Sequence, residues 1–209
     1  MNLCADSLTK TGGIQPSDGG AIPTSALHFR PSDSIEPRKF ISRVHYSQSC
    51  PPGKFYFVAE SKSRVVGALV FRKPSLPKVE KAYGADLELV RLAMLDECSK
   101  NSESKFIGWA LRWLKKQTGH HRVVSFSDPR FGHRGGIYRA SNFRYLGMEV
   151  GHGTRRIVID GKEFHPKSVF DAYGCSGSGL KKIFPEKEIE IIVCPPKHVF
   201  QFDLTDEGR

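Results

Sequence analysis

The stretch SFSDPRFGHRGGIYRASNFRYLG, residues 125–147, decides how the rest of the chain is interpreted. A β-rich run, RVVSFSD, leads into a Gly-rich turn, and IYRASNFRYLG then predicts a short helix. The turn delivers an acid, an imidazole and cations at the end of the strand: Asp128, Arg130, His133 and Arg134. Because a merely structural loop does not require so dense a polar set, we expect a functional site here.

The surroundings of this stretch are strongly basic. Between residues 104 and 148 the only acid is Asp128. The whole chain has a formal net charge of +10 and a pI near 9.5. Basic proteins bind phosphate backbones by releasing counterions, so double-stranded DNA is the expected partner, with a merely solvated surface as the alternative. The candidate DNA-binding residues are Arg130, Arg134, Arg139, Arg144, Lys115 and Lys116.

Two motifs resemble known families. YRASNFRYLG resembles the closing motif of the GNAT acyltransferase superfamily. The longer string SDPRFGHRGGIYRASNFRYLGM, with FHPKSVFDAYG downstream, resembles the Mom family of phage DNA-modification proteins. The resemblance follows the order of elements over residues 55–200. It implies an α+β fold in a single domain, with a GNAT-like central mixed, mostly antiparallel sheet flanked by helices.

The resemblance also implies a function. Mom-like proteins add a carbamoylmethyl group to the exocyclic amine of adenine in DNA, which protects phage DNA from host restriction. In GNAT enzymes a Tyr in a similar helix protonates the departing thiolate of acyl-CoA, and this implies a general-acid role for Tyr138. Asp128 lies in the same motif and is the second candidate catalytic residue.

Two further candidates come from predicted strands. KFYFVAE, SKSR and VVGALVFRK predict a hairpin, and Tyr56 in its first strand either packs in the core or lines the site. LELVRLAML predicts a buried strand that Arg91 interrupts. That side chain either reaches the edge of the sheet or holds an anion at the strand end.

A helix is predicted after DECSKNSES, because Phe106, Ala110 and Leu114 recur with helical spacing. Ser102 or Ser104 is expected to cap it, and with Lys105 they form the candidate cofactor site. GNAT enzymes hold the pyrophosphate of CoA at this helix, which implies acetyl-CoA or a related donor. The usual Gly-rich loop is replaced by SKNSESK, so the use of acetyl-CoA stays open.

A metal is the least expected part of the site. Carbamoylmethyl transfer forms a bond to a methylene carbon, and the methyl of an acetyl thioester is not electrophilic. A redox-active ion is one source of the missing activation. Imidazole and oxygen donors suit iron, and the candidates are His45, Tyr46, Asp128 and Tyr138. The alternative is that His45 and Tyr46 simply pack against the sheet.

The remaining sequence sets the domain boundaries. Residues 1–37 are rich in Gly, Ser, Thr and Pro, which predicts a flexible leader before a catalytic domain over residues 38–209. KFISRVHYSQSC, at the start of that domain, fits either a strand or a short helix. A mean hydropathy of −0.37 and the lack of a secretory signal predict a cytoplasmic protein, in the host cell if a phage encodes it. Five cysteines without a CxxC pair indicate neither a disulfide framework nor a zinc ribbon.

Alternative functions remain at this point. A conventional GNAT N-acetyltransferase would act on a protein or small-molecule amine and would need only Tyr138 as general acid. A non-enzymatic DNA-binding module would use the basic surface alone. A metal-dependent nuclease built on His120, His121 and His133 is weaker, because nearby carboxylates are few. A homodimer is also left open by the sequence.

Overall fold

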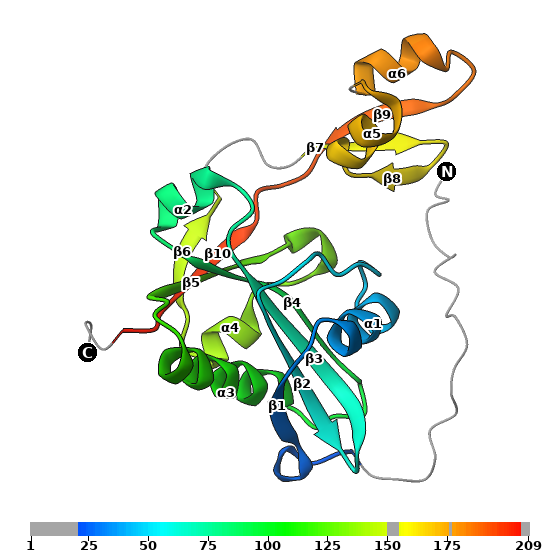
Figure 1. Cartoon of the computed structure of the whole chain (residues 1–209). Helices are drawn as coiled ribbons and strands as arrows, with labels where there is room; N and C mark the ends of the chain where they lie inside the picture. The colour runs from blue at the N-terminus through cyan, green and yellow to red at the C-terminus, as the bar shows by residue number, and fades with distance from the viewer. Residues whose placement is uncertain (1–20, 150–154, 176, 206–209) are drawn as a thin grey trace.

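The computed structural model describes residues 21–149, 155–175 and 177–205 (Figure 1). Its main sheet has seven strands in the order β1 (His28–Ser32), β2 (Phe55–Ser61), β3 (Arg64–Arg72), β4 (Leu87–Met94), β5 (Arg122–Ser127), β10 (His198–Asp203) and β6 (Arg144–Met148). Every neighbouring pair is antiparallel except β4 and β5, which are parallel. The predicted α+β architecture, a mixed and mostly antiparallel sheet flanked by helices, is confirmed.

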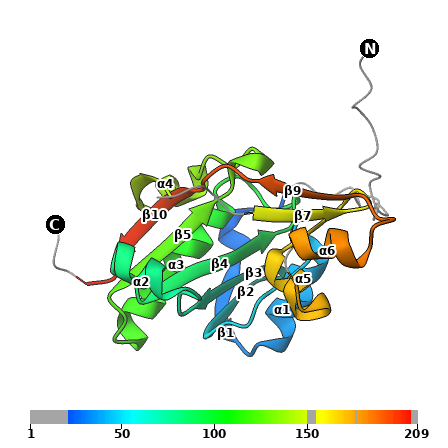
Figure 2. The same ribbon diagram turned by 90° about the horizontal axis from the view of Figure 1, so that it is seen from above.

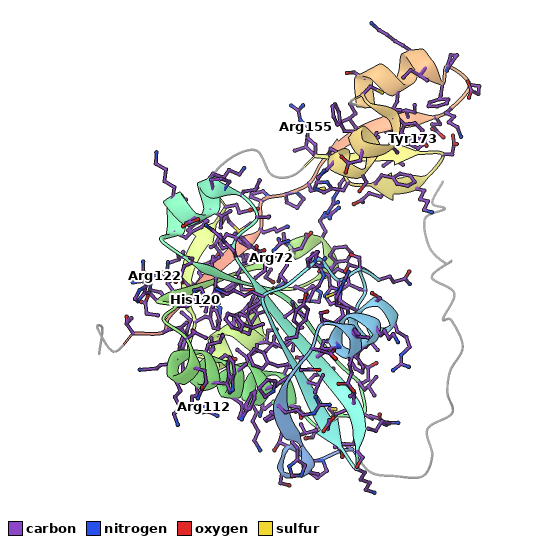
Figure 3. The ribbon with its side chains drawn as sticks, viewed as in Figure 1. Arg72, Arg112, His120, Arg122, Arg155 and Tyr173 are labelled. Carbon is purple, nitrogen blue, oxygen red and sulfur yellow. The ribbon has the colours of Figure 1, made fainter. Side chains whose placement is uncertain are left out.

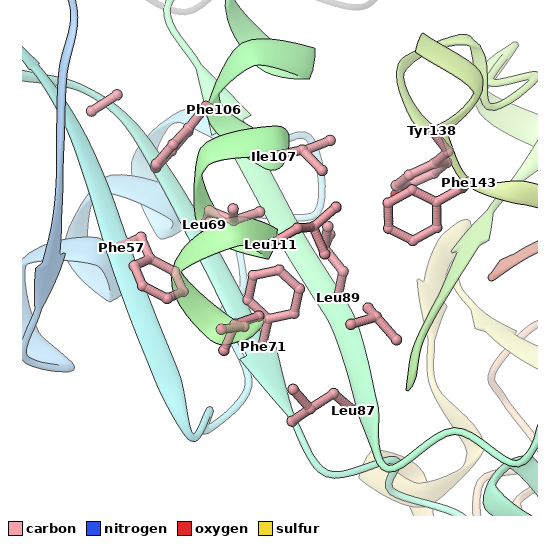
Figure 4. Close-up of a cluster of buried hydrophobic side chains, with 14 of the residues drawn as sticks. Phe57, Leu69, Phe71, Leu87, Leu89, Phe106, Ile107, Leu111, Tyr138 and Phe143 are labelled. Carbon is pink, nitrogen blue, oxygen red and sulfur yellow. The ribbon is translucent and has the colours of Figure 1, made fainter. Parts of the chain in front are cut away.

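Helices cover both faces of this sheet. One face carries α3 (Ser102–Gln117) and α4 (Gly136–Ala140), and the other carries α1 (Ile35–Val44) and α2 (Pro77–Tyr83). The apolar stripe of α3 packs on strand residues such as Phe57 and Phe71, as Figure 4 shows. Burial on both faces explains why β3 is an almost continuous apolar run.

The predicted hairpin joins β2 and β3 through a two-residue turn. Lys62 and Ser63 both have positive φ, at 47° and 61°. Such turns match the right-handed twist of the paired strands, which explains why a short polar SKSR segment is sufficient here. The hairpin therefore forms where the sequence predicted it.

Strands β4 and β5 separate after a short parallel contact. Their pairing runs only from Leu87–Val123 to Leu89–Ser125. Just beyond it, Val90 has no direct partner on β3, because the register shifts between Val70 and Phe71. A bulge of this kind bends a strand, so β4 turns away from β5 and opens the sheet at this point.

Residues 155–193 form a second, smaller unit that we call the insert. It contains β7 (Arg155–Ile159), β8 (Lys162–Phe164), α5 (Pro166–Tyr173), α6 (Gly177–Ile183) and β9 (Ile189–Val193), with strand order β8-β7-β9. Its own core is built from Ile157, Val169, Leu180 and Ile189. Figures 1 and 2 show it projecting beyond the end of the main sheet. Short connections without a recognisable linker explain why the sequence did not reveal this unit.

Two local predictions need correction, and one open alternative is decided. Residues 28–32 of the expected leader form β1 along β2, after a 3-10 helix at Thr24–Ala26, while residues 1–20 lie outside the described residues. The ambiguous KFISRVHYSQSC segment begins inside α1. The helix predicted over IYRASNFRYLG ends at Ala140, and its second half is β6, which lies at the edge of the sheet.

Candidate functional site

A cavity of about 860 Å³ lies where β4 and β5 diverge. Residues 88–94 of β4 and residues 126–128 at the end of β5 form two of its walls. The Gly-rich turn with the start of α4, residues 130–138, forms a third wall, and the end of α1 with the loop after it, residues 44–47, forms a fourth. The insert adds Arg156 and Glu163, and Lys197 follows just before β10. The turn and the strand end that the sequence singled out therefore do form a concave, polar site.

The Gly-rich turn holds α4 close to the sheet. Gly135 begins the helix with a φ of 71°, a conformation that side chains rarely adopt. A Cβ at this position would also collide with the ring of Phe200. The Oγ of Ser127 donates to the carbonyl of His133 at 3.0 Å and closes the turn on the strand. These contacts fix the approach of Tyr138 to the cavity.

Tyr138 lines the cavity from a buried position in α4. Its ring packs between Phe143 and Phe200, with centroids 5.5 and 5.1 Å away. Burial, opposed by the nearby Ser125 hydroxyl, raises the pKa of Tyr138 to about 12. The phenol is therefore protonated near neutral pH and is suited to donate a proton.

Asp128 lines the same cavity and is held by Arg130. Its Oδ1 accepts from the backbone N–H of Arg130 at 3.0 Å, and its Oδ2 accepts from Nη2 at 3.1 Å. Burial raises the pKa of Asp128, but the hydrogen bonds from Arg130 outweigh burial and leave the pKa below its ordinary value. The carboxylate is therefore ionised near neutral pH.

Arg91 points its guanidinium at backbone carbonyls. Its Nε donates to the Ser49 carbonyl at 2.9 Å and its Nη1 to the Val90 carbonyl at 2.8 Å. The side chain lines the cavity at the β4 bulge. The partners of Arg91 among the described residues are thus backbone carbonyls, and its role in holding an anion stays a prediction.

Four rings gather at one side of the cavity. Tyr46 lies 4.1 Å from His45, 4.4 Å from Phe131 and 5.4 Å from His133, measured between ring centroids. Tyr46 and Phe131 are about half exposed, at 53% and 50%. This aromatic cluster offers planar apolar surface beside the polar wall.

The four candidate iron ligands line one cavity, and two of them, His45 and Asp128, are engaged in hydrogen bonds. Nδ1 of His45 accepts the backbone N–H of Ser47 at 3.1 Å, so the ring proton belongs on Nε2 and neither nitrogen is a free donor. The Asp128 carboxylate is engaged by Arg130. No cluster of three or more His, Cys, Asp or Glu side chains with metal-binding geometry occurs among the described residues. We therefore derive no step through iron.

The start of α3 does not fit a pyrophosphate either. The residue before the helix is Asn101, at a φ of 71°, and neither Ser102 nor Ser104 caps it, which corrects that prediction. Ser104 Oγ donates to the Asn101 carbonyl, and Lys105 Nζ donates to the Thr24 carbonyl. The first-turn residue that does line the cavity is Glu103, whose negative charge opposes a phosphate.

Tyr56 lies away from the cavity. Its hydroxyl accepts the backbone N–H of Gly53 at 2.5 Å, and its ring packs in the cluster beneath α1. Alternation along β2 explains this, because Phe57 points to the α3 face and its neighbour must point the other way. The structure therefore favours the packing alternative for Tyr56.

The six candidate DNA-binding residues do not form one surface. Arg134 is exposed and lines the cavity, whereas Arg130 is engaged by carboxylates. Arg139 lies over the Tyr145 ring, and Arg144 donates to Gln201. Lys115 and Lys116 lie in the last turn of α3. Figure 3 shows Arg112, one turn earlier in the same helix, at the end of the molecule opposite to the insert. Of the six, Arg130 and Arg134 therefore lie at the cavity.

Sequence reasoning missed several groups at the cavity. Arg156, Glu163 and Lys197 carried no motif that marked them. All three lie 18 residues or more beyond Tyr138 along the chain. Only the folded topology brings them to the site.

The family model of the Mom protein family matches residues 26–197. The methylcarbamoylase mom of Escherichia phage Mu is 35% identical over 139 residues, which are 61% of this chain and 55% of that protein. The chain thus spans about half the length of this curated relative.

Solved structures give weaker similarities. The polyamine N-acetyltransferase of Drosophila melanogaster has a TM-score of 0.49 and 11% identity, covering 85% of this chain and 99% of that one. The ribosomal-protein-S5-alanine acetyltransferase of Vibrio fischeri has a TM-score of 0.49 and 10% identity, covering 88% and 96%. Neither similarity assigns an activity. In the described part of the chain, no helix is long and apolar enough to cross a membrane. Because the family model extends over most of the sequence, the chain belongs to the Mom protein family.

Proposed function

We propose that this protein is a transferase that adds a carbamoylmethyl group to the exocyclic amine of adenine in DNA. The phage Mu relative is named a methylcarbamoylase, and the family match extends over residues 26–197. The observation that carries the proposal is the convergence of Tyr138 and Asp128 on one cavity, with the exposed Arg134 beside them. If a phage encodes the protein, the reaction would take place in the host cytoplasm and protect the DNA from restriction.

The reaction needs a donor with an electrophilic methylene carbon. The exocyclic nitrogen of adenine forms a bond to that carbon, the bond from the carbon to the leaving group breaks, and its electron pair departs with the leaving group. Tyr138 supplies the proton that the leaving group takes up, since its pKa of about 12 keeps it protonated. Asp128 accepts a hydrogen bond from the amine and orients it, and the proton lost by the amine passes to water.

The donor itself is not assigned. An acyl-CoA is the expectation from the resemblance, but Glu103 occupies the α3 end of the cavity and no Gly-rich loop exposes backbone amides there. We therefore define the donor only by its chemistry, as a carbamoylmethyl group attached to a leaving group.

The target base has to leave the duplex to reach the cavity. Extrusion costs a few kcal/mol, and enzymes that modify bases recover this cost by stacking and hydrogen bonding the flipped base. Tyr46 and Phe131 present half-exposed rings next to the polar wall, which suits stacking on a purine. The cavity volume of about 860 Å³ is within the range of small-molecule sites and admits a single nucleoside.

The test is nucleoside mass spectrometry of DNA from cells that express the protein. The proposal expects a deoxyadenosine that carries one carbamoylmethyl group in place of a hydrogen. An acetylated protein or small molecule without modified DNA would instead favour a conventional N-acetyltransferase. DNA binding without any covalent product would favour a non-enzymatic module.

A further inference from the structure

One pair of side chains makes the hydrogen bonds between the insert and the rest of the described structure. It has its own sheet and its own core, so its packing does not depend on the main sheet. Among the described residues, the side-chain hydrogen bonds that cross between the insert and the body all join Glu163 to Arg130. Figure 3 shows Arg155 and Tyr173 on the insert, away from the main sheet. The hydrogen bonding across the junction is therefore concentrated on a single carboxylate.

That carboxylate belongs to a line of alternating charges. Oε1 and Oε2 of Glu163 accept from Arg130 Nη1 at 3.2 and 3.3 Å. The opposite edge of the same guanidinium, Nε and Nη2, holds Asp128 at 3.1–3.4 Å. On the other side, Nε of Arg156 lies 3.3 Å from Glu163 and makes no hydrogen bond among the described residues. Each of these four side chains lines the cavity.

The rigid guanidinium of Arg130 connects the position of Glu163 to that of Asp128. A guanidinium is planar and offers donors on fixed edges, so fixing one edge fixes the other. Glu163 holds Nη1 from the insert, and this sets the plane in which Nε and Nη2 meet Asp128. Arg130 and Asp128 have side chains only 20% and 10% exposed, so water competes weakly for these hydrogen bonds.

We propose that Glu163 is a positioning residue that orients Asp128 through Arg130 and thereby couples the insert to the cavity. Glu163 does not contact the reacting atoms in this account. Its effect on reaction rate rests on the proposed function of Asp128, whereas its effect on the Gly-rich turn does not.

The test compares Glu163→Gln with Glu190→Gln in the full-length protein. Both variants remove one negative charge from the same face of the small sheet, because Glu163 and Glu190 each pair with Val158. Glu190 is exposed and makes no ion pair among the described residues, so it is a matched control. Hydrogen exchange of residues 128–134 is measured first, since it requires no activity.

The proposal expects Glu163→Gln to speed exchange in residues 128–134 with an unchanged melting temperature and unchanged affinity for DNA. The rate of adenine modification should fall about tenfold, as for the loss of a hydrogen bond to a charged group. Glu190→Gln should match the wild type in every measurement. In an Asp128→Asn background, Glu163→Gln should cause no further loss of rate, because its effect passes through Asp128.

Two results would overturn the proposal. Unchanged exchange in residues 128–134 of Glu163→Gln would show that Glu163 does not hold Arg130. An equal further loss of rate in the Asp128→Asn background would show that Glu163 acts elsewhere. If the wild type does not modify DNA, the proposed function fails, while the exchange result still decides whether Glu163 positions Arg130.

Discussion

Ser125, at the last position where β5 pairs with β4, lies beside the Tyr138 hydroxyl and lowers its pKa. Ser125 Oγ donates to the Leu89 carbonyl at 3.0 Å. The candidate proton donor therefore lies at the point where the sheet opens.

Replacing Ser125 with Ala should destabilise the fold. The substitution removes the buried hydrogen bond from Ser125 Oγ to the Leu89 carbonyl, at a cost of about 1–3 kcal/mol. It also removes the hydroxyl that lowers the pKa of Tyr138, so that pKa should rise further. Urea unfolding measures the stability, with Ser42→Ala on the exposed side of α1 as the control. Equal unfolding free energies for the two variants would contradict this role of Ser125.

Folding stability should fall as the pH drops below about 6.5, partly because of His45. Burial, together with the charges of Arg91 and His133, lowers the pKa of His45 to about 4 in the folded protein. In the unfolded chain the imidazole of His45 has its ordinary pKa of about 6.5, so the unfolded state binds the proton at a higher pH than the folded state does. His45 therefore contributes stability that is complete above that pH and is lost towards pH 4.

The measurement is the free energy of unfolding at pH 7 and at pH 5 for the wild type and for His45→Gln. The Gln side chain does not titrate, so the variant should lose less stability between the two pH values. A drop as large as that of the wild type would show that other groups produce the pH dependence.

Arg134 should contribute directly to DNA affinity. It is exposed at the cavity, and it makes no ion pair or hydrogen bond among the described residues. Arg134→Ala should weaken binding to any DNA sequence and reduce the slope of log affinity against log salt by about one. Lys78→Ala, on the exposed surface of α2, is the control. An unchanged salt slope for Arg134→Ala would show that Arg134 does not contact a DNA phosphate.

Phe131 should contribute to binding of the extruded base. Base–aromatic stacking is worth about 1–3 kcal/mol per base. Phe131→Ala should therefore weaken binding of a short adenine-containing single strand at least about fivefold, as measured by fluorescence anisotropy. A Phe131→Tyr variant keeps a stacking ring and should bind like the wild type. Similar affinities for the Ala and Tyr variants would contradict stacking on this ring.

Sequence patterns predicted the elements better than the contacts between them. The hairpin of β2 and β3 and the helix α3 are local patterns, and both form as predicted. Tyr138 and Asp128 belong to one motif, so their proximity was also visible in the sequence. The separation of β4 and β5, which creates the cavity between them, depends on a bulge at Val90 that no sequence pattern marks.

The role of Arg130 shows where such prediction stops. Its position in a cationic stretch indicated DNA binding, but Asp128 and Glu163 take up its guanidinium in the structure. Glu163 lies 33 residues away in sequence, on a strand of the insert. A carboxylate that lies far from Arg130 along the chain therefore pairs with it in the folded protein.

The most direct test of the account is nucleoside mass spectrometry of DNA exposed to the wild type, to Tyr138→Phe and to Tyr173→Phe. Tyr138→Phe removes only the proposed proton donor and should reduce modified deoxyadenosine about 100-fold or more, the usual contribution of general acid catalysis. Tyr173→Phe, a hydroxyl loss on the exposed insert surface, should leave the yield unchanged. Carbamoylmethyl deoxyadenosine at the wild-type level in Tyr138→Phe, or its absence from DNA exposed to the wild type, would contradict the account.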